Sequence, residues 1–361
     1  MSPVRAAGAQ LSRIAGRAEQ LNAPLSALFE LTGRCNLDCG HCYLDIANPP
    51  RELSTEEALR VVDELADAGT LFLTLTGGEL VLRKDALVVA AHARKRGLAL
   101  RLFTNATRIT RTLAAEIARV RPLGVEVSIY GTHGAGHDAV TRRHALRRTL
   151  RGVLLLKRAG VPVGLKAPVL AGVARELDAI VRLARRIGAP IAFDPFVTPR
   201  HDGQTAPTAL RAETEALAEA LRHPVMGLGT ALPPPLELEQ APCAIARRTT
   251  RIDPSGNVFP CPTYPEAAGN LLERSFQSIW REAPLLQRLR RVRMKDLTGA
   301  CAGCAQSGYC GRCSAVARIE HGDELGPSYE SCRVAEAKEI AIEGTRRGPP
   351  RRPPLRLRVL G

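Results

Sequence analysis

The chain has 361 residues, a formal net charge of +15 at pH 7, and 45% hydrophobic residues. A chain of this length can bury a sizeable core and form two domains. We identify no signal peptide, and no apolar run approaches the roughly 20 residues of a membrane span, so we expect a cytoplasmic protein rather than a secreted or membrane-embedded one. The basic charge fits either a plain soluble surface or attraction of an acidic partner.

Strands alternate with helices over the first part of the chain. We expect strands at Ala27–Leu31, Leu71–Leu75, Ala99–Phe103, Val125–Ile129, Val163–Pro168 and Ile191–Phe193. Helices are expected from a Ser54/Glu57 capping box to Gly69, and at Asp85–Arg96, Thr112–Val120, Arg143–Ala159, Arg175–Ile187 and Arg211–Arg222. Such βα units predict an α/β fold with a parallel sheet and crossover helices, and a partial (βα)6 barrel fits them.

Three cysteines lie close together near the N-terminus: Cys35, Cys39 and Cys42, with the spacing C-x3-C-x2-C. Thiolates are soft ligands that suit iron–sulfur clusters and zinc. Three cysteines leave one iron of a four-iron cube without a protein ligand, and that iron can hold another molecule. A closed zinc site would need a fourth Cys or His, and His41 is poorly placed for it. A zinc knuckle or scattered buried thiols are the alternative interpretations.

A second motif, Thr76-Gly77-Gly78-Glu79, follows the strand expected at Leu71–Leu75. Glycine lets a backbone approach a ligand closely, and Glu79 can accept a hydrogen bond from an ammonium group. Asn105 and Ser128 lie at two further strand ends. The carboxyl ends of parallel strands share one edge of a sheet, so we expect these residues to lie near the cysteine triplet.

Seven further cysteines lie in the C-terminal third. They are Cys243, Cys261, Cys301, Cys304, Cys310, Cys313 and Cys332. Residues 251–260 predict two short strands joined by a Pro-Ser-Gly turn. The run that follows has the dense spacing C-x2-C-x5-C-x2-C and then a distant cysteine, for which two zinc ribbons are the alternative interpretation.

The N-terminal motifs, together with Phe103-Thr104-Asn105-Ala106-Thr107 and the strand end at residues 125–131, resemble the radical S-adenosylmethionine (SAM) superfamily. The resemblance implies that Cys35, Cys39 and Cys42 hold a [4Fe–4S] cluster. Its open iron would bind the amino and carboxylate groups of SAM, and the Gly-Gly-Glu segment would hold the methionyl amine. Reductive cleavage of SAM would give a 5′-deoxyadenosyl radical that abstracts hydrogen from a substrate. Leu80 departs from the family pattern, which normally has proline there.

The C-terminal cysteines are similar to the SPASM extension of radical SAM enzymes, which holds auxiliary [4Fe–4S] clusters. The last gap, Cys310 to Cys313, is one residue shorter than the commonest form. The resemblance implies one complete site with four thiolates (Cys301, Cys304, Cys310 and Cys332) and one with three (Cys243, Cys261 and Cys313). The second cluster would then have an open iron or a ligand other than cysteine.

Three further features leave alternatives open. Lys166, in the fifth expected strand, would meet the SAM carboxylate if it points inward, and an edge or snorkelling lysine is the alternative. The loop at Pro195–Pro207 lines a substrate opening or is a plain surface turn, and its T-P-R-x-D-G run resembles peptide-modifying SPASM proteins. His133, His137 and His144 form a metal site or are exposed or capping residues.

The resemblance implies an enzyme that modifies a ribosomally made precursor peptide, with catalytic side chains unassigned. Expected partners are that peptide, a separate leader-peptide recognition protein, and a reductant such as flavodoxin or ferredoxin; neither a membrane nor nucleic acid is expected. The alternatives are side-chain processing of a tetrapyrrole in haem synthesis, and a non-catalytic iron–sulfur or zinc-binding interaction protein.

The expected domain limits follow from these motifs. We expect an N-terminal extension at 1–24, a radical SAM partial barrel at 25–210, a helix and linker at 211–242, a SPASM domain at 243–335, and a helix end with a disordered basic tail at 336–361.

Overall fold

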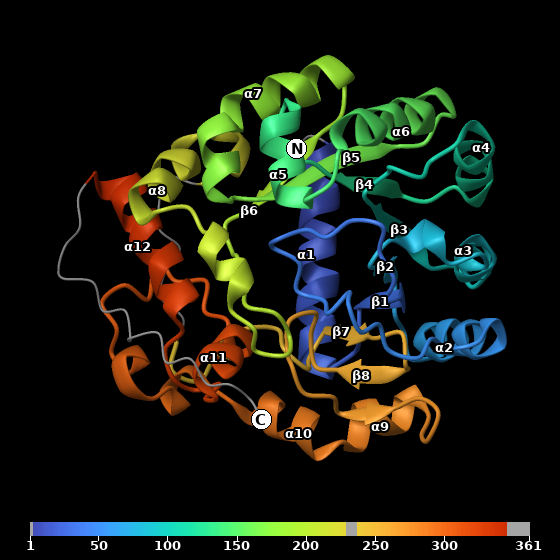
Figure 1. Ribbon diagram of the computed structural model, residues 1–361. Helices are drawn as coiled ribbons and strands as arrows, with labels where there is room; N and C mark the ends of the chain where they lie inside the picture. Colours follow the sequence, from blue (N-terminus) through green and yellow to red (C-terminus); the bar gives the residue numbers. More distant parts are fainter. Residues whose placement is uncertain (1–2, 229–236, 345–361) are drawn as a thin grey trace.

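The computed structural model describes residues 3–228 and 237–344 (Figure 1). Two expected features, the prolines of the linker at Pro233–Pro235 and the arginine-rich tail after Gly344, lie outside the described residues. No helix of the described part is both long enough and apolar enough to cross a bilayer.

One sheet runs through the described residues, with strand order β6-β5-β4-β3-β2-β1-β7-β8-β9. Its strands are β1 (Ser26–Thr32), β2 (Phe72–Gly77), β3 (Ala99–Thr104), β4 (Gly124–Ser128), β5 (Val163–Pro168), β6 (Ile191–Asp194), β7 (Thr249–Ile252), β8 (Asn257–Phe259) and β9 (Gly269–Asn270). The first six pair in parallel, which confirms the α/β prediction and places each expected strand within two residues of its observed ends.

Most of the helices lie along the outer side of the curved sheet or beyond its two ends, and the N-terminal helix runs behind its centre (Figure 1). They are α1 (Pro3–Leu21), α2 (Thr55–Asp67), α3 (Ala86–Lys95), α4 (Arg111–Val120), α5 (Gly134–Thr141), α6 (Leu146–Arg158), α7 (Ala171–Ile187), α8 (Thr214–Arg222), α9 (Phe276–Glu282), α10 (Pro284–Arg291), α11 (Ser314–His321) and α12 (Tyr329–Glu343). The capping box at Ser54 and Glu57 is present as predicted.

Two helical segments differ from the sequence expectation. The N-terminal extension contains α1, because its alanine, arginine, leucine and glutamine residues favour a helix. The helix expected from Arg143 instead begins at Leu146, because a carboxylate oxygen of Asp138 accepts hydrogen bonds from the backbone N–H groups of Ala145 and Leu146. Asp138 belongs to α5, which the sequence analysis did not identify.

Strand β7 extends the parallel sheet on the far side of β1. Its residues pair with β1 from Ser26↔Thr249 to Phe29↔Ile252. The two short strands predicted around the Pro-Ser-Gly turn are β7 and β8, which pair antiparallel, and Gly256 in the turn has φ +86°. The sheet therefore continues from the expected barrel into the cysteine-rich part, with β1 in its interior.

The glycine pair after β2 lies against the backbone that leads from β1 into the cysteine loop. A Cβ on Gly77, where φ is +141°, would lie 2.3 Å from the carbonyl oxygen of Thr32, and one on Gly78 would lie 2.4 Å from that of Arg34. The N–H of Gly78 donates to Thr32 O at 2.8 Å, and that of Glu79 donates to Arg34 O at 2.8 Å. Glycine is thus required by backbone contact at the start of the cysteine loop.

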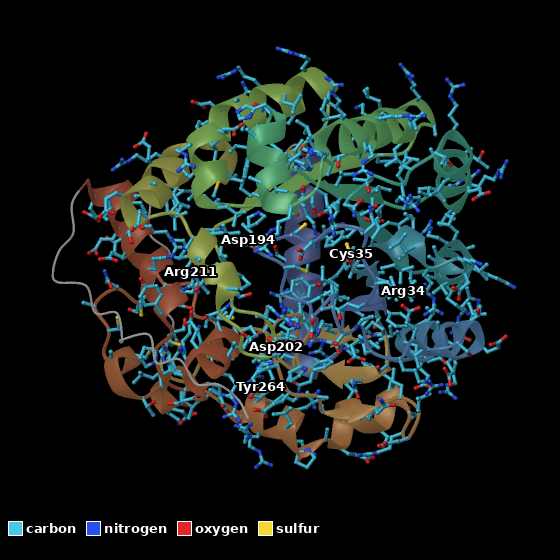
Figure 2. The ribbon with its side chains drawn as sticks, in the orientation of Figure 1. Arg34, Cys35, Asp194, Asp202, Arg211 and Tyr264 are labelled. Carbon is cyan, nitrogen blue, oxygen red and sulfur yellow. The ribbon has the colours of Figure 1, made fainter. Side chains whose placement is uncertain are left out.

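A buried ionic cluster joins the barrel to the last two helices. Arg211 donates to Glu320 of α11 at 2.9 Å and lies 2.8 Å from a carboxylate oxygen of Glu330 on α12. Glu330 also accepts hydrogen bonds from Arg333 and from the backbone N–H of Val197. The side chains of Arg211, Glu320, Glu330 and Arg333 are at most 7% exposed. Figure 2 shows Arg211 beside these helices.

Replacing Gly78 with alanine should disturb the cysteine loop, because its methyl group would overlap a backbone oxygen that cannot move independently. We expect Gly78→Ala to lose about four of the roughly 12 irons expected for three clusters after anaerobic reconstitution. Iron and sulfide analysis measures this. Gly172→Ala in α7 is the control, since a Cβ there meets nothing within 4 Å. Full iron content in Gly78→Ala would contradict the prediction.

Arg211→Met should lower the free energy of unfolding by about 3–5 kcal/mol, because it leaves buried carboxylates without their cation. Arg274→Met is the matched control, because the Arg274–Glu282 pair is exposed and such pairs contribute about 0–1 kcal/mol. Urea unfolding followed by circular dichroism compares the two. Equal losses would show that the buried cluster contributes no more than a surface pair.

Candidate functional site

A cavity of about 810 Å³ opens where the parallel strands end, within the usual range for small-molecule sites. Its lining includes Cys35, Cys39 and Cys42, the expected SAM contacts Gly77, Gly78, Asn105, Ser128 and Lys166, and, from the C-terminal part, Thr263, Cys313 and Val316. Figure 2 labels Cys35 and Asp194, which line the cavity from the cysteine loop and from β6. Of the expected SAM contacts, Glu79 alone does not line the cavity described here.

The cysteine loop is held by hydrogen bonds to neighbouring elements. The N–H groups of Asp38 and Gly40 donate to carbonyls at the end of α5, at 3.2 and 2.9 Å. The side chain of Asn36 accepts from Asn105 at 3.1 Å and donates to Thr107 at 2.8 Å. Hydrogen bonds to α5 and to the segment after β3 therefore fix the position of the cysteine loop at the ends of the strands.

Burial keeps the thiols of this loop protonated when they bind nothing. It raises the pKa of Cys39 well above its usual value, and the neighbouring Cys42 and Cys35 raise it further. It also raises the pKa of Cys42 to about 11. A metal site supplies the positive charge that converts such thiols to thiolates, so cluster binding would release protons here. Three soft donors around one loop fit an iron–sulfur cluster with an open iron.

The Glu79 carboxylate is buried within the protein and does not line the cavity. It is 1% exposed, and its carboxylate accepts hydrogen bonds from Thr104 Oγ1 at 2.6 Å and from the backbone N–H of Asn105 at 2.7 Å. Burial raises its pKa, which these hydrogen bonds partly offset. The geometry gives Glu79 a positioning role at the β3 end, where Asn105 contacts the cysteine loop.

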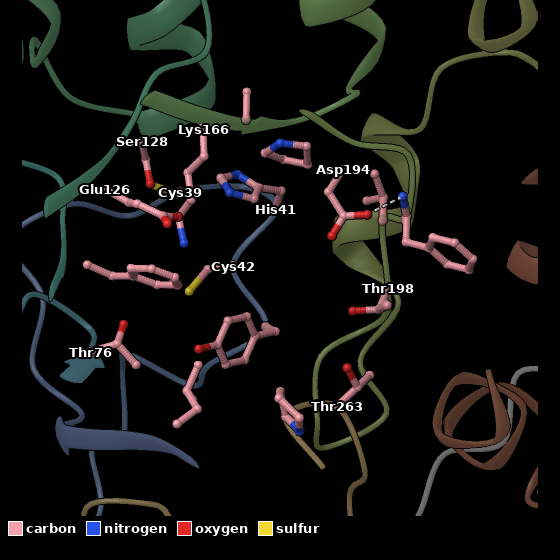
Figure 3. A pocket seen from close by; sticks show the side chains of 18 of the residues that line it. Cys39, His41, Cys42, Thr76, Glu126, Ser128, Lys166, Asp194, Thr198 and Thr263 are labelled. Atoms are coloured by element: carbon pink, nitrogen blue, oxygen red, sulfur yellow. Dashed lines mark hydrogen bonds between the residues drawn. The ribbon is translucent and has the colours of Figure 1, made fainter. Parts of the chain in front are cut away.

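Lys166 points into the cavity, with its Nζ 3.0 Å from the centroid of the Phe103 ring. Burial lowers its pKa to about 8, while Glu126 and Asp194 favour its charged form. Figure 3 shows Lys166 near Ser128 and Glu126 on the cavity wall. The inward alternative is therefore the observed one, and the cation is available for an anionic ligand group.

Asp194, at the end of β6, was not identified from the sequence. Its carboxylate accepts a hydrogen bond from the N–H of Phe196 at 2.9 Å, drawn as a dashed line in Figure 3, and remains open to the cavity. Loss of hydration within the cavity raises the pKa of Asp194, and the hydrogen bond from Phe196 and the charge of Lys166 partly offset this rise. An aspartate directly after a strand, at the edge that carries the other motifs, was the available signal.

A second polar group missed by sequence reasoning joins the cysteine loop to β1 and β7. Tyr43 directly follows Cys42 and donates to Glu30 at 3.0 Å. Nη1 of Arg251 in β7 lies 3.6 Å from a carboxylate oxygen of Glu30 and 2.5 Å from Nδ1 of His201. The backbone N–H of His201 donates to the Tyr43 carbonyl at 3.1 Å. Glu30 within an apolar strand was the signal. The loop at Pro195–Pro207, which contains His201, does line the cavity.

The seven C-terminal cysteines fall into two spatial groups. The pKa of Cys332 is raised to about 12, first by burial and then by Cys310, Cys301 and Cys304. The pKa of Cys261 is raised to about 12 by burial, then by Cys313 and Cys243. All ten cysteines are free thiols.

The two groups have the chemistry of iron–sulfur sites. In the described residues, no group of three or more His, Cys, Asp or Glu side chains is arranged for a single metal ion. A [4Fe–4S] cluster does not require such an arrangement, because each thiolate binds a different iron. The donors therefore suit two auxiliary clusters, and the three-cysteine group reaches the cavity through Cys313.

The three histidines after β4 have structural positions. His133 caps α5 by accepting from the N–H of Gly136, and buried His137 accepts from the N–H of Tyr130 at 3.2 Å. The exposed His144 contacts Asp138. The capping and exposed alternatives are thus observed for His133 and His144, whereas His137 is buried.

Comparison with known proteins agrees with this geometry. Residues 29–184 match the model of the radical SAM superfamily, and residues 243–305 match the SPASM iron–sulfur cluster-binding domain. The AdoMet-dependent heme synthase of Methanosarcina barkeri is 28% identical over 333 residues, covering 84% of this chain and 95% of that protein. The mycofactocin maturase MftC of Mycolicibacterium smegmatis is 29% identical over 321 residues, covering 82% of this chain and 79% of that protein.

Solved structures share the fold. Streptococcus suis SuiB bound to S-adenosylmethionine superposes with a TM-score of 0.68 at 17% identity, covering 85% of this chain and 76% of that one. The protein anSMEcpe with bound AdoMet superposes with a TM-score of 0.67 at 15% identity, covering 89% and 93%. The chain therefore belongs to the radical SAM superfamily and carries a C-terminal SPASM domain.

Proposed function

We propose that this radical SAM enzyme modifies a ribosomally made precursor peptide. The supporting observation is the charge of its cavity, whose described lining contains one lysine or arginine, Lys166, and two carboxylates, Glu126 and Asp194. A peptide segment with a neutral backbone suits such a wall. A tetrapyrrole of haem synthesis carries several carboxylate side chains, for which this lining offers a single cation that SAM itself would also use.

The chain's own residues would bind and orient the reactants. When bound and reduced, the cluster at Cys35, Cys39 and Cys42 supplies the electron that cleaves SAM. Lys166 would pair with the SAM carboxylate, and Asn105 and Ser128 would contribute hydrogen bonds beside it. Asp194 and Thr198 line the wall on the β6 side, where they would hold polar groups of the substrate. The enclosing strands and the 195–207 loop would exclude water from the reaction.

The names of relatives support two substrate classes. MftC is named as a maturase, AlbA of Bacillus subtilis as a bacteriocin biosynthesis protein, and one SuiB structure contains the precursor peptide SuiA. Haem synthesis is the second candidate, because the M. barkeri heme synthase matches over 95% of its own length. The proposal includes a separate leader-recognition protein and a flavodoxin- or ferredoxin-type reductant in the cytoplasm.

One assay separates the candidates. The anaerobically reconstituted enzyme receives SAM and dithionite, together with peptides encoded by short reading frames beside its gene or with iron coproporphyrin. We expect a peptide to increase formation of 5′-deoxyadenosine and to change its own mass. Stimulation by iron coproporphyrin alone, with loss of carboxyl groups, would overturn the peptide proposal in favour of the haem alternative.

Replacing Cys35, Cys39 and Cys42 together with alanine should abolish 5′-deoxyadenosine formation while about eight irons remain bound at the C-terminal cysteines. Liquid chromatography of the nucleoside and iron analysis measure the two outcomes. Stoichiometric zinc in place of iron, or unchanged SAM cleavage, would refute the assignment of these cysteines.

Lys166→Met should weaken SAM binding by about 1.5–3 kcal/mol, the loss of a charge-assisted hydrogen bond, or roughly tenfold to hundredfold in Kd. The lysine is charged below its pKa of about 8, with Glu126 and Asp194 as its charged neighbours. The ratio of the Kd of Lys166→Met to that of the wild type should therefore be largest well below pH 8 and fall towards one as the pH rises through about 8. Anaerobic calorimetry measures both.

Two controls isolate the carboxylate contact. Lys157→Met removes a lysine that donates to Gly188 O, away from the cavity lining, and should leave the Kd for SAM unchanged. Methylthioadenosine lacks the carboxylate, so its Kd should be the same in wild type and Lys166→Met. If its affinity falls as much as that of SAM, Lys166 does not bind the carboxylate.

A further inference from the structure

Arg312 lies between the two groups of C-terminal cysteines. It belongs to the short Cys310–Cys313 gap, immediately before α11, and is only 9% exposed. A buried guanidinium needs acceptors for its five N–H groups, since it cannot lose its proton. The hydrogen bonds of its two Nη atoms and the unpaired Nε atom together indicate what Arg312 binds.

Two backbone carbonyls fix the orientation of this side chain. Nη1 donates to Gly326 O at 2.8 Å, and Nη2 donates to Glu324 O at 2.5 Å. Nη1 also donates to Cys301 Sγ at 3.7 Å. Neutral carbonyls do not neutralise the guanidinium, so its full positive charge stays next to the thiol.

The Nε atom of Arg312 is buried without a hydrogen-bond partner among the described residues. The Nε atoms of Arg200, Arg247, Arg248 and Arg251 share this state. Within the described chain, however, Arg312 is the arginine with a hydrogen bond to a cysteine. An unpaired donor beside soft ligands indicates an acceptor supplied by a bound group, and cluster sulfides and thiolates are such acceptors.

The charge of Arg312 reaches both cysteine groups. Its guanidinium donates to Cys301 Sγ in the four-cysteine group. Cys313 of the three-cysteine group directly follows Arg312 in the chain. One cation therefore lies beside a member of each group.

We propose that Arg312 is a hydrogen-bond donor and fixed cation between the two auxiliary iron–sulfur sites, and that it raises the reduction potential of the cluster held by Cys301. The proposal rests on the proposed function only in requiring that both cysteine groups hold clusters. Reduction adds negative charge to a cluster, and a donor with a positive charge stabilises the reduced form more than the oxidised form. Arg312 thereby makes this auxiliary cluster a better electron acceptor.

Potentiometry on the full chain with Cys35, Cys39 and Cys42 replaced by alanine tests this, because only auxiliary clusters then contribute to the electron paramagnetic resonance spectrum. We expect Arg312→Gln to reduce the equilibrium constant for cluster reduction at least tenfold, a decrease of about 59 mV for one electron. Arg312→Lys keeps the positive charge but loses the planar set of guanidinium donors, so we expect a smaller decrease in the reduction potential than for Arg312→Gln.

Arg274→Gln is the control for the loss of a positive charge elsewhere in the C-terminal part. Arg274 donates to Ser278 and Glu282 of α9, and it makes no hydrogen bond to a cysteine in the described structure. Its replacement should leave both potentials unchanged. Iron analysis of the parent separates the two hypotheses: fewer than about eight irons there contradicts the cluster assignment itself. Full iron with unchanged potentials in Arg312→Gln overturns the role of Arg312.

A measurement on the parent protein keeps the test decisive if both Arg312 variants lose iron. With ¹⁵N-labelled arginine, pulsed electron paramagnetic resonance of the reduced auxiliary cluster should detect coupling to a guanidinium nitrogen. Coupling supports the proposal. Its absence overturns the proposal, because a donor to the cluster or its thiolate lies within the range of this method.

Discussion

Strand β1 is the constraint on which the site depends. It pairs in parallel with β2 on one side and with β7 on the other, and the cysteine loop begins where it ends. The backbone after β2 approaches that loop so closely that Gly77 and Gly78 have no room for a Cβ. Since β7 leads into the SPASM hairpin, one strand sets the position of the Cys35 loop relative to both parts of the chain.

Buried charged side chains also connect segments that are far apart in the chain. The Arg211–Glu330 contact holds the loop after β6 against α12, which carries Cys332, while Glu30 connects Tyr43 with Arg251 of β7. Removing one member of such a group leaves another charge unpaired in a low dielectric, so each remaining side chain depends on its partner in another segment of the chain.

The cavity contains few charged side chains, and they come from different strands. Lys166 provides the cation at the strand ends, Glu126 and Asp194 face it, and Cys313 contributes from the SPASM side. This separation suits a reactant with one carboxylate and a substrate that is not polyanionic. In the SPASM domain, Arg312 donates to Cys301 Sγ and directly precedes Cys313, so one guanidinium lies beside both groups of thiols.

The sequence by itself determined the parallel strands, the motifs at their ends and the two sets of cysteines, because hydrophobic periodicity, glycine spacing and cysteine spacing are local signals. Only the tertiary structure decided that β7 joins β1 and that Glu79 binds the β3 end instead of facing the cavity. It also decided that Asp194 lines the cavity and that Arg312 contacts Cys301. Those outcomes depend on contacts between residues far apart in the chain. Burial and pairing of charges, which have no local sequence signature, select among them.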